Sequence, residues 1–246
     1  MSAVLATSCG DGAARDVASR RAGAGRPRDA ESAARDDSES LATASPDSNG
    51  ARNAAVPASA PRQTILFIGT SLTAGFGIDL SQAYPAVVGR MLDSAGRPAR
   101  IVNAGVSGET SAGALRRIDW VLRTPADVIL VETGANDGLR GLDLAAMRDN
   151  IETMLDRIRV VQPHARVLLV QMEAPPNLGP AYTQGFHDLF PTIAKEKHVE
   201  LMPFLLDGVA GNPDLNQDDG IHPNVRGARI VAGNVVRALD RRRADP

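Results

Sequence analysis

The 246-residue chain contains one cysteine, few aromatic residues (3%) and no long apolar run. A single cysteine excludes an intramolecular disulfide framework and any multi-cysteine zinc site. Without an apolar run of about 18 residues, no transmembrane segment is expected. The 27 basic and 29 acidic residues give a formal net charge of −2. The chain therefore lacks the excess of lysine and arginine that a nucleic-acid binder or a basic membrane-surface protein needs.

Residues 1–61 differ in composition from the rest of the chain. They contain no Phe, Tyr or Trp and few large aliphatic residues, and consist mostly of Ala, Ser, Gly, Arg and Asp. Such a segment cannot bury enough apolar surface to offset an ordering entropy of about 1–2 kcal/mol per residue. We therefore predict a disordered tail over residues 1–61 and one folded domain over residues 62–246. The alternative is an alanine-driven helical extension, although no apolar stripe recurs at helical spacing.

The residues around Cys9 raise the question of a lipid anchor. Residues 4–10 resemble the end of a bacterial lipoprotein signal, in which small residues precede an acylated cysteine. The charged segment and the apolar stretch of about 7–15 residues that precede such a site are missing. Either the true start lies upstream, or Cys9 is a free thiol in a flexible tail, and both interpretations stay open. The candidate anchor favours the bacterial periplasm or envelope over the cytoplasm by a small margin.

From residue 64 onward, short apolar runs alternate with longer amphipathic segments. The pattern predicts strands at 64–68, 100–103, 127–132, 167–171 and 200–203, and helices at 84–95, 111–123, 144–161, 184–197 and 223–241. Strands that alternate with helices favour a parallel sheet covered on both faces. The right-handed crossover rule then predicts a three-layer α/β/α sandwich with a mostly parallel, flavodoxin-like sheet of five strands. In such α/β folds, ligands bind outside the carboxyl ends of the strands.

Polar residues follow the predicted strands at that edge. Ser71 lies between the first strand and a glycine-containing loop, where a hydroxyl can be presented with little steric cover. The glycines after the second strand, in residues 103–110, allow backbone N–H groups to face a cleft, as an oxyanion site requires. Asn136, after the third strand, is a neutral side-chain donor of the kind that suits an oxyanion. Taken singly, each feature is also consistent with turn or helix-cap chemistry.

An acid and an imidazole precede the last predicted helix. Asp219 and His222 are three residues apart on a tight turn, so the carboxylate can hold Nδ1–H while Nε2 acts as a base. We interpret His164, His187 and His198 as structural or solvated. No metal is expected, because this turn lacks further ligands at suitable spacing. No cofactor is expected either, and the loop after the first strand lacks the ending of a phosphate-binding loop.

In this order the segments resemble the four motif blocks of the SGNH hydrolases, also called GDSL-type esterases and lipases. The resemblance extends over about 180 residues, from residue 64 to about residue 239. It implies the SGNH hydrolase fold for the domain at residues 62–246. The stretches that carry it are 69–72, 103–110, 134–141 and 218–224.

The resemblance implies a role for each of these residues. Ser71 is the implied nucleophile, and His222 is the implied general base, oriented by Asp219. The N–H of Ser71, the N–H of Gly108 and the side chain of Asn136 form the implied oxyanion hole. One departure from the family pattern is that Thr70 stands where the family name has aspartate. We expect this change to affect how the loop around the nucleophile is supported rather than the chemistry.

The implied activity is hydrolysis of carboxylic esters or thioesters through an acyl-enzyme, of the arylesterase, acyl thioesterase or lysophospholipase type. The expected partner is a small-molecule acyl ester or thioester, and we expect the protein to be a monomer. Candidate substrate-binding residues are Leu72, Leu139 and Pro176, in an apolar groove with Phe76 and Leu142. Ordinary core and rim packing explains these side chains equally well.

Two other functions are consistent with part of the pattern. A carbohydrate acetylesterase uses the same machinery in a polar cleft lined by aromatic residues, and the shortage of aromatic residues counts against it. A non-catalytic, flavodoxin-like protein that binds a nucleotide or flavin is the more remote alternative. The first strand is followed by no phosphate-binding glycine loop and no aromatic residue placed to stack on a flavin.

Overall fold

The computed structural model describes residues 62–241. The predicted tail over residues 1–61, with the candidate anchor Cys9, lies outside the described residues, as do residues 242–246. The described part forms one sheet with the strand order β2-β1-β3-β4-β5, and every neighbouring pair is parallel. The strands are β1 (Gln63–Gly69), β2 (Ala99–Gly105), β3 (Val128–Val131), β4 (Arg166–Val170) and β5 (Glu200–Met202).

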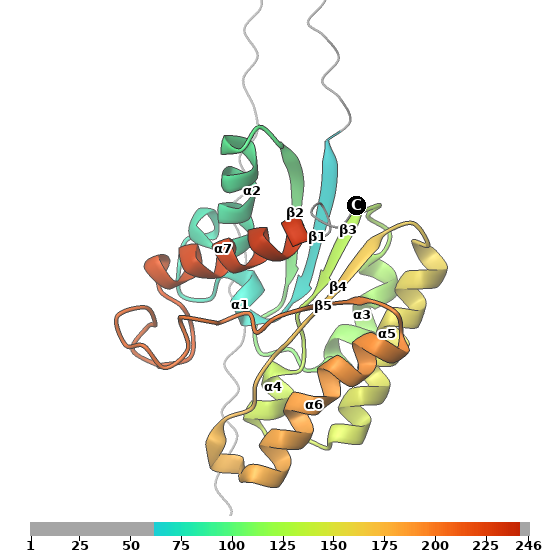
Figure 1. The fold of residues 1–246 in the computed structure, drawn as a ribbon, viewed down its shortest axis with the longest axis vertical. Coiled ribbons are helices and arrows are strands. Elements are labelled where there is room, and N and C mark those ends of the chain that lie inside the picture. Colours follow the sequence, from blue (N-terminus) through green and yellow to red (C-terminus); the bar gives the residue numbers. More distant parts are fainter. Residues whose placement is uncertain (1–61, 242–246) are drawn as a thin grey trace, which may run out of the picture. The chain divides into compact units, whose positions relative to one another are not determined.

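Helices cover both faces of the sheet (Figure 1). On one face α2 (Tyr84–Ser94) packs against α7 (Val225–Arg241), and on the other α5 (Leu144–Val161) packs between α3 (Ser111–Val121) and α6 (Pro180–Glu196). Because apolar layers lie on both faces, all four residues of β3 are buried. Shorter elements are the helices α1 (Ser71–Ala74) and α4 (Ala135–Leu139) and the 3-10 turns η1 (Leu80–Gln82) and η2 (Pro176–Leu178).

The three-layer α/β/α class and the five-stranded sheet are as predicted, and the sheet is wholly rather than mostly parallel. The largest boundary error is at α6, which begins at Pro180 instead of residue 184. Proline suits the first turn of a helix, since the N–H that it lacks has no partner there. The helix α7 begins at Val225, because Asn224 Oδ1 accepts the N–H groups of Arg226 and Gly227 and caps it.

The strand order places a switch point between β1 and β3. The chain leaves β1 for α2 on one face, and it leaves β3 for α4 and then α5 on the other face. The loops that leave β1 and β3 therefore diverge, and ligands of open α/β sheets bind in the crevice formed at such a point. No helix within residues 62–241 is both long and apolar enough to cross a bilayer.

The close approach of β2 to α1 requires a glycine at position 105. A Cβ atom built there lies 2.3 Å from the backbone nitrogen of Ala74. We expect Gly105→Ala to lower the free energy of unfolding by about 1–3 kcal/mol, as other overpacking substitutions do. The matched control is Gly233→Ala in α7, where a Cβ meets only the Arg237 guanidinium, at 3.6 Å. There alanine should add about 0.5–1 kcal/mol of stability; urea denaturation that gave both variants equal stability would contradict this account.

Candidate active site

Ser71 lies at the sharp turn from β1 into α1. Thr70 is in extended conformation and Ser71 is the first residue of α1, whose end is closed by Gly75 at φ 76°. The strand, the turn and the short helix together point the Ser71 side chain into a cavity at the carboxyl edge of the sheet. The sequence predicted this position but not α1, because four residues are too few for helical periodicity.

A chain of hydrogen bonds joins the three residues that the sequence singles out as nucleophile, base and acid. Ser71 Oγ lies 2.8 Å from His222 Nε2, and His222 Nδ1 lies 2.6 Å from Asp219 Oδ2. An ionised carboxylate can only accept, so Nδ1 carries the hydrogen and donates it to Asp219. In the neutral imidazole, Nε2 then has a free lone pair that accepts the Ser71 hydroxyl.

Asp219 is held in its ionised form. Burial acts to raise the pKa of this carboxyl, but hydrogen bonds from the His222 N–H, the His222 imidazole and the Ile221 N–H outweigh it and lower the pKa to about 2. Both backbone donors lie 2.9 Å from Asp219 Oδ1. The carboxylate is thus a permanent acceptor for the imidazole at neutral pH.

The loop that carries His222 is fastened to the loop after α1. Gln217 Nε2 donates to the carbonyl oxygen of Phe76 at 2.7 Å, and the Gln217 N–H donates to the carbonyl oxygen of His222 at 2.8 Å. The Phe76 ring packs against the imidazole of His222, with centroids 4.6 Å apart. These contacts restrict the movement of the imidazole and of the loop that carries it.

The groups predicted as oxyanion donors line the same cavity as Ser71 and His222. Gly108 lies in the loop after β2 at φ 76°, a left-handed conformation that suits glycine. Within residues 62–241, neither the Ser71 N–H nor the Gly108 N–H has a hydrogen-bond acceptor. Asn136, in α4, uses one amide hydrogen to reach the Glu109 carbonyl at 3.0 Å, which leaves its second hydrogen to donate elsewhere.

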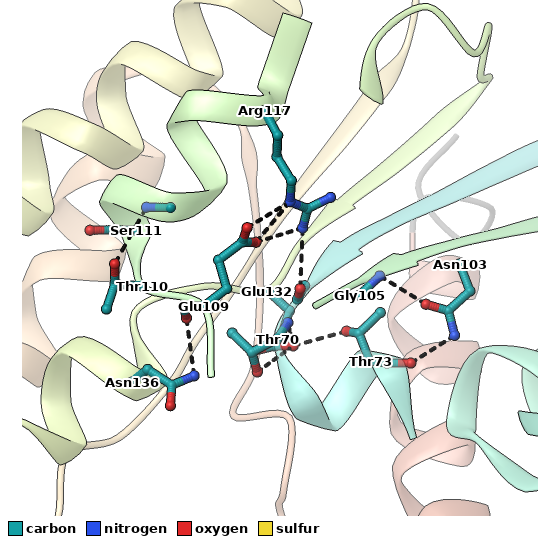
Figure 2. A network of polar contacts seen from close by, with 12 residues as sticks. Thr70, Thr73, Asn103, Gly105, Glu109, Thr110, Ser111, Arg117, Glu132 and Asn136 are labelled. Carbon is teal, nitrogen blue, oxygen red and sulfur yellow. Dashed lines mark hydrogen bonds and ion pairs between the residues drawn. The ribbon is translucent and has the colours of Figure 1, made fainter. Parts of the chain in front are cut away.

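Glu132 is a buried residue beneath the nucleophile that the sequence analysis treated only as the end of a strand. Its carboxylate accepts the Thr70 N–H (2.7 Å), the Thr70 hydroxyl (2.8 Å) and the Thr73 hydroxyl (2.9 Å), as Figure 2 shows in part. The Thr73 hydroxyl also lies 2.7 Å from the hydroxyl of Tyr84. Burial raises the pKa of Glu132 to about 7 against the opposing effect of these hydrogen bonds. An acid at the end of an apolar strand is the signal that could have identified it.

The cavity has a volume of about 430 Å³ and mostly apolar walls. Leu72, Leu139 and Pro176, the predicted substrate-binding residues, all line it. Leu142, which we expected in the same groove, is not among the lining residues. Its backbone carbonyl oxygen accepts a hydrogen bond from the hydroxyl of Tyr182. In the described part of the chain, no three His, Cys, Asp or Glu side chains are grouped so that they could hold a metal ion.

The sequence around this site is similar to that of a known protein family. Residues 67–230 match the sequence pattern of the GDSL-like Lipase/Acylhydrolase family. The chain belongs to this family. Like its relatives, it is a carboxylic ester hydrolase, which confirms the predicted family and enzyme class.

Relatives of this GDSL-like hydrolase match it over almost their whole length. Esterase TesA of Pseudomonas aeruginosa is 40% identical over 178 residues, which are 72% of this chain and 87% of that protein. Thioesterase 1/protease 1/lysophospholipase L1 of Escherichia coli K12 is 36% identical over 73% of this chain and 85% of its own. The crystal structure of the psychrotrophic esterase EstA from Pseudoalteromonas superposes with a TM-score of 0.70 at 31% identity, and covers 74% of this chain and 100% of that one.

The raised pKa of Glu132 predicts a pH dependence of stability. An unfolded glutamate titrates near pH 4.3, so between about pH 4.5 and pH 7 the folded state keeps a proton that the unfolded state has released. The free energy of unfolding therefore falls as pH rises through this window. Asp219, whose pKa is lowered to about 2, acts with the opposite sign and only in more acidic solution, where its stabilising contribution is lost as pH falls.

Glu132→Gln should remove this dependence. We expect the variant to gain stability relative to the native protein as pH is raised from 5 to 8, measured by urea denaturation at each pH. Glu196→Gln is the control, because its carboxylate lies on the surface of α6, and its difference from the native protein should stay constant. A difference for Glu132→Gln that is the same at pH 5 and pH 8 would show that Glu132 does not titrate in this window.

Proposed function

We propose that this protein hydrolyses esters or thioesters of medium or long acyl chains through a Ser71–His222–Asp219 triad and an acyl-enzyme. The observation that carries the proposal is the pair of hydrogen bonds from Ser71 Oγ to His222 Nε2 and from His222 Nδ1 to Asp219. The relatives named esterase and thioesterase 1/lysophospholipase L1 support the bond types.

Acylation begins when His222 Nε2 takes the hydroxyl proton as Ser71 Oγ attacks the acyl carbonyl carbon. The new C–O bond converts the carbonyl oxygen to an oxyanion, which accepts hydrogen bonds from the Ser71 N–H, the Gly108 N–H and the Asn136 amide. When the intermediate collapses, the bond to the leaving oxygen or sulfur breaks and the leaving group takes the proton from Nε2. Asp219 stays ionised throughout and stabilises the imidazolium.

Deacylation repeats these steps with water as the nucleophile. His222 Nε2 removes a proton from water, the resulting hydroxide attacks the acyl-enzyme carbonyl, and the same donors hold the second oxyanion. Collapse breaks the bond to Ser71 Oγ, which recovers its proton from Nε2, and the carboxylic acid leaves. No cofactor enters this sequence.

The walls of the cavity support an apolar acyl substrate. Leu72, Leu139 and Pro176 contribute apolar surface beside the site, and only Glu173 and His222 among the lining residues have side chains that titrate. Glu173 is paired with His187 at 2.8 Å. A long alkyl chain gains about 0.8 kcal/mol for each buried CH₂, so the cavity favours acyl chains longer than acetyl.

Hydrolysis of 4-nitrophenyl esters from acetate to palmitate tests both parts of the proposal. We expect kcat/KM to peak at medium or long chains, and Ser71→Ala to lose turnover on every ester while its thermal unfolding stays unchanged. Equal rates for Ser71→Ala and the native enzyme would refute the serine mechanism. A profile restricted to acetate would refute the chain-length assignment and favour a carbohydrate acetylesterase.

Asn136→Ala tests the oxyanion hole separately from the triad. Loss of one such donor lowers kcat by about 10²–10³-fold, and we expect a loss in that range with little change in KM. Asn136→Asp is the matched variant, because it keeps the shape of the side chain but removes the amide donors, and it should lose at least as much. Turnover near the native value in either variant would remove Asn136 from the oxyanion hole.

A further inference from the structure

An ion pair behind the cavity joins the loop after β2 to the helix that follows it. Arg117, on α3, donates from Nε to both oxygens of Glu109 at 2.7 and 2.9 Å, and from a terminal nitrogen at 2.6 Å. The side chains of Arg117 and Glu109 are 19% and 9% exposed, so solvent screens them little. The fork geometry fixes the position of Glu109 more tightly than a single contact would.

The same two residues hold the backbone on either side of the proposed oxyanion hole. The carbonyl oxygen of Glu109 accepts the Asn136 side-chain amide at 3.0 Å, and Glu109 directly follows Gly108. A terminal nitrogen of Arg117 also lies 3.4 Å from the carbonyl oxygen of Gly69, two residues before Ser71. Figure 2 shows Glu109 between Arg117 and Asn136. One guanidinium thus connects the loop of the nucleophile with the loop that orients Asn136.

The packing leaves room for this ion pair. A Cβ at Gly113, in the first turn of α3, would lie 2.7 Å from Glu109 Cγ, so a glycine there lets the glutamate lie against the helix.

Neither Arg117 nor Glu109 lines the cavity. Substrate therefore does not touch them, and any effect on catalysis passes through the groups that they hold.

We infer that the Arg117–Glu109 ion pair is the positioning element of the oxyanion hole: it fixes the Glu109 carbonyl, and through it the Asn136 amide, relative to Ser71. This inference rests on the proposed function and adds two positioning residues to it. A donor displaced by about 1 Å can lose as much as 10²-fold in rate, so a change at Arg117 should appear in kcat.

The first test compares two arginines with similar surroundings. In Arg117→Lys the charge remains, but the three bonds to Glu109 cannot all form. We expect kcat on 4-nitrophenyl butyrate to fall about 10- to 100-fold while KM stays within about threefold. The control is Arg166→Lys, because Arg166 also pairs with a glutamate, Glu200, and donates to backbone carbonyls, but at the amino end of β4. Its kcat should stay within about twofold of the native value.

A double-mutant cycle with Asn136→Ala separates positioning from general destabilisation. If Arg117 acts through Asn136, the effect of Arg117→Lys should be at least fivefold smaller in the Asn136→Ala background. A smaller difference between backgrounds, or a native kcat in Arg117→Lys, overturns the inference. Glu109→Gln provides a second variant with the same expectations, and thermal unfolding confirms that each variant is folded at the assay temperature.

The two proposals fail in distinguishable ways. If Ser71→Ala keeps full activity, the proposed function fails whatever the cycle gives. If Ser71→Ala is inactive and Asn136→Ala loses rate as expected, but the effects of Arg117→Lys and Asn136→Ala multiply, only the positioning role of the ion pair fails.

Discussion

The parallel pairing of β1 between β2 and β3 is the constraint on which the candidate active site depends. Gly69 pairs with Gly105, and Ile68 pairs with Val131, so the three strands end at nearly the same level. Neighbouring strands are about 4.8 Å apart, and the loops that leave them begin within reach of one another. The serine, the glycine N–H and the asparagine amide, which are far apart in sequence, meet because the sheet aligns the ends of these strands.

Alignment of the strands does not by itself fix the conformation of the loops. Three acidic side chains help to fix the loops by accepting hydrogen bonds from their backbone. Each accepts backbone N–H groups: Glu132 from the nucleophile turn, Asp137 from Ser111 at the start of α3, and Asp219 from its own turn beside His222. In a poorly solvated site these hydrogen bonds are stronger than in water and hold the donors in place before substrate arrives. A site that stabilises an oxyanion depends on this preorganisation, since donors that must reorient during the reaction contribute less.

The fold could be predicted because its signals are local. The apolar runs of the strands and the helical spacing of α5 predict the type and order of these secondary-structure elements, and the crossover rule predicts the three layers. Ser71 and Asn136 could be selected because they follow strands, where α/β folds bind ligands. The roles of Glu109 and Arg117 could not be predicted from the sequence. Their pairing depends on how the loop after β2 folds back on α3, and two charged residues eight positions apart show no periodic signal. The start of α6 was missed for a related reason, because a proline that follows a glycine is as typical of a loop as of a helix start.

The replacement of the family's aspartate by Thr70 can now be explained in physical terms. The Thr70 side chain contacts Glu132 directly, and its hydroxyl donates to both carboxylate oxygens at 2.8 and 3.1 Å. An ionised aspartate in this position would place a negative charge beside the buried Glu132 and raise the pKa of that carboxyl further. Threonine provides a hydrogen-bond donor without adding a charge. The N–H and the hydroxyl of one residue thereby tie the turn to the residue that follows β3, and Ser71 Oγ still lies 2.8 Å from His222. The change alters the support of the loop and leaves the hydrogen bond between serine and histidine intact.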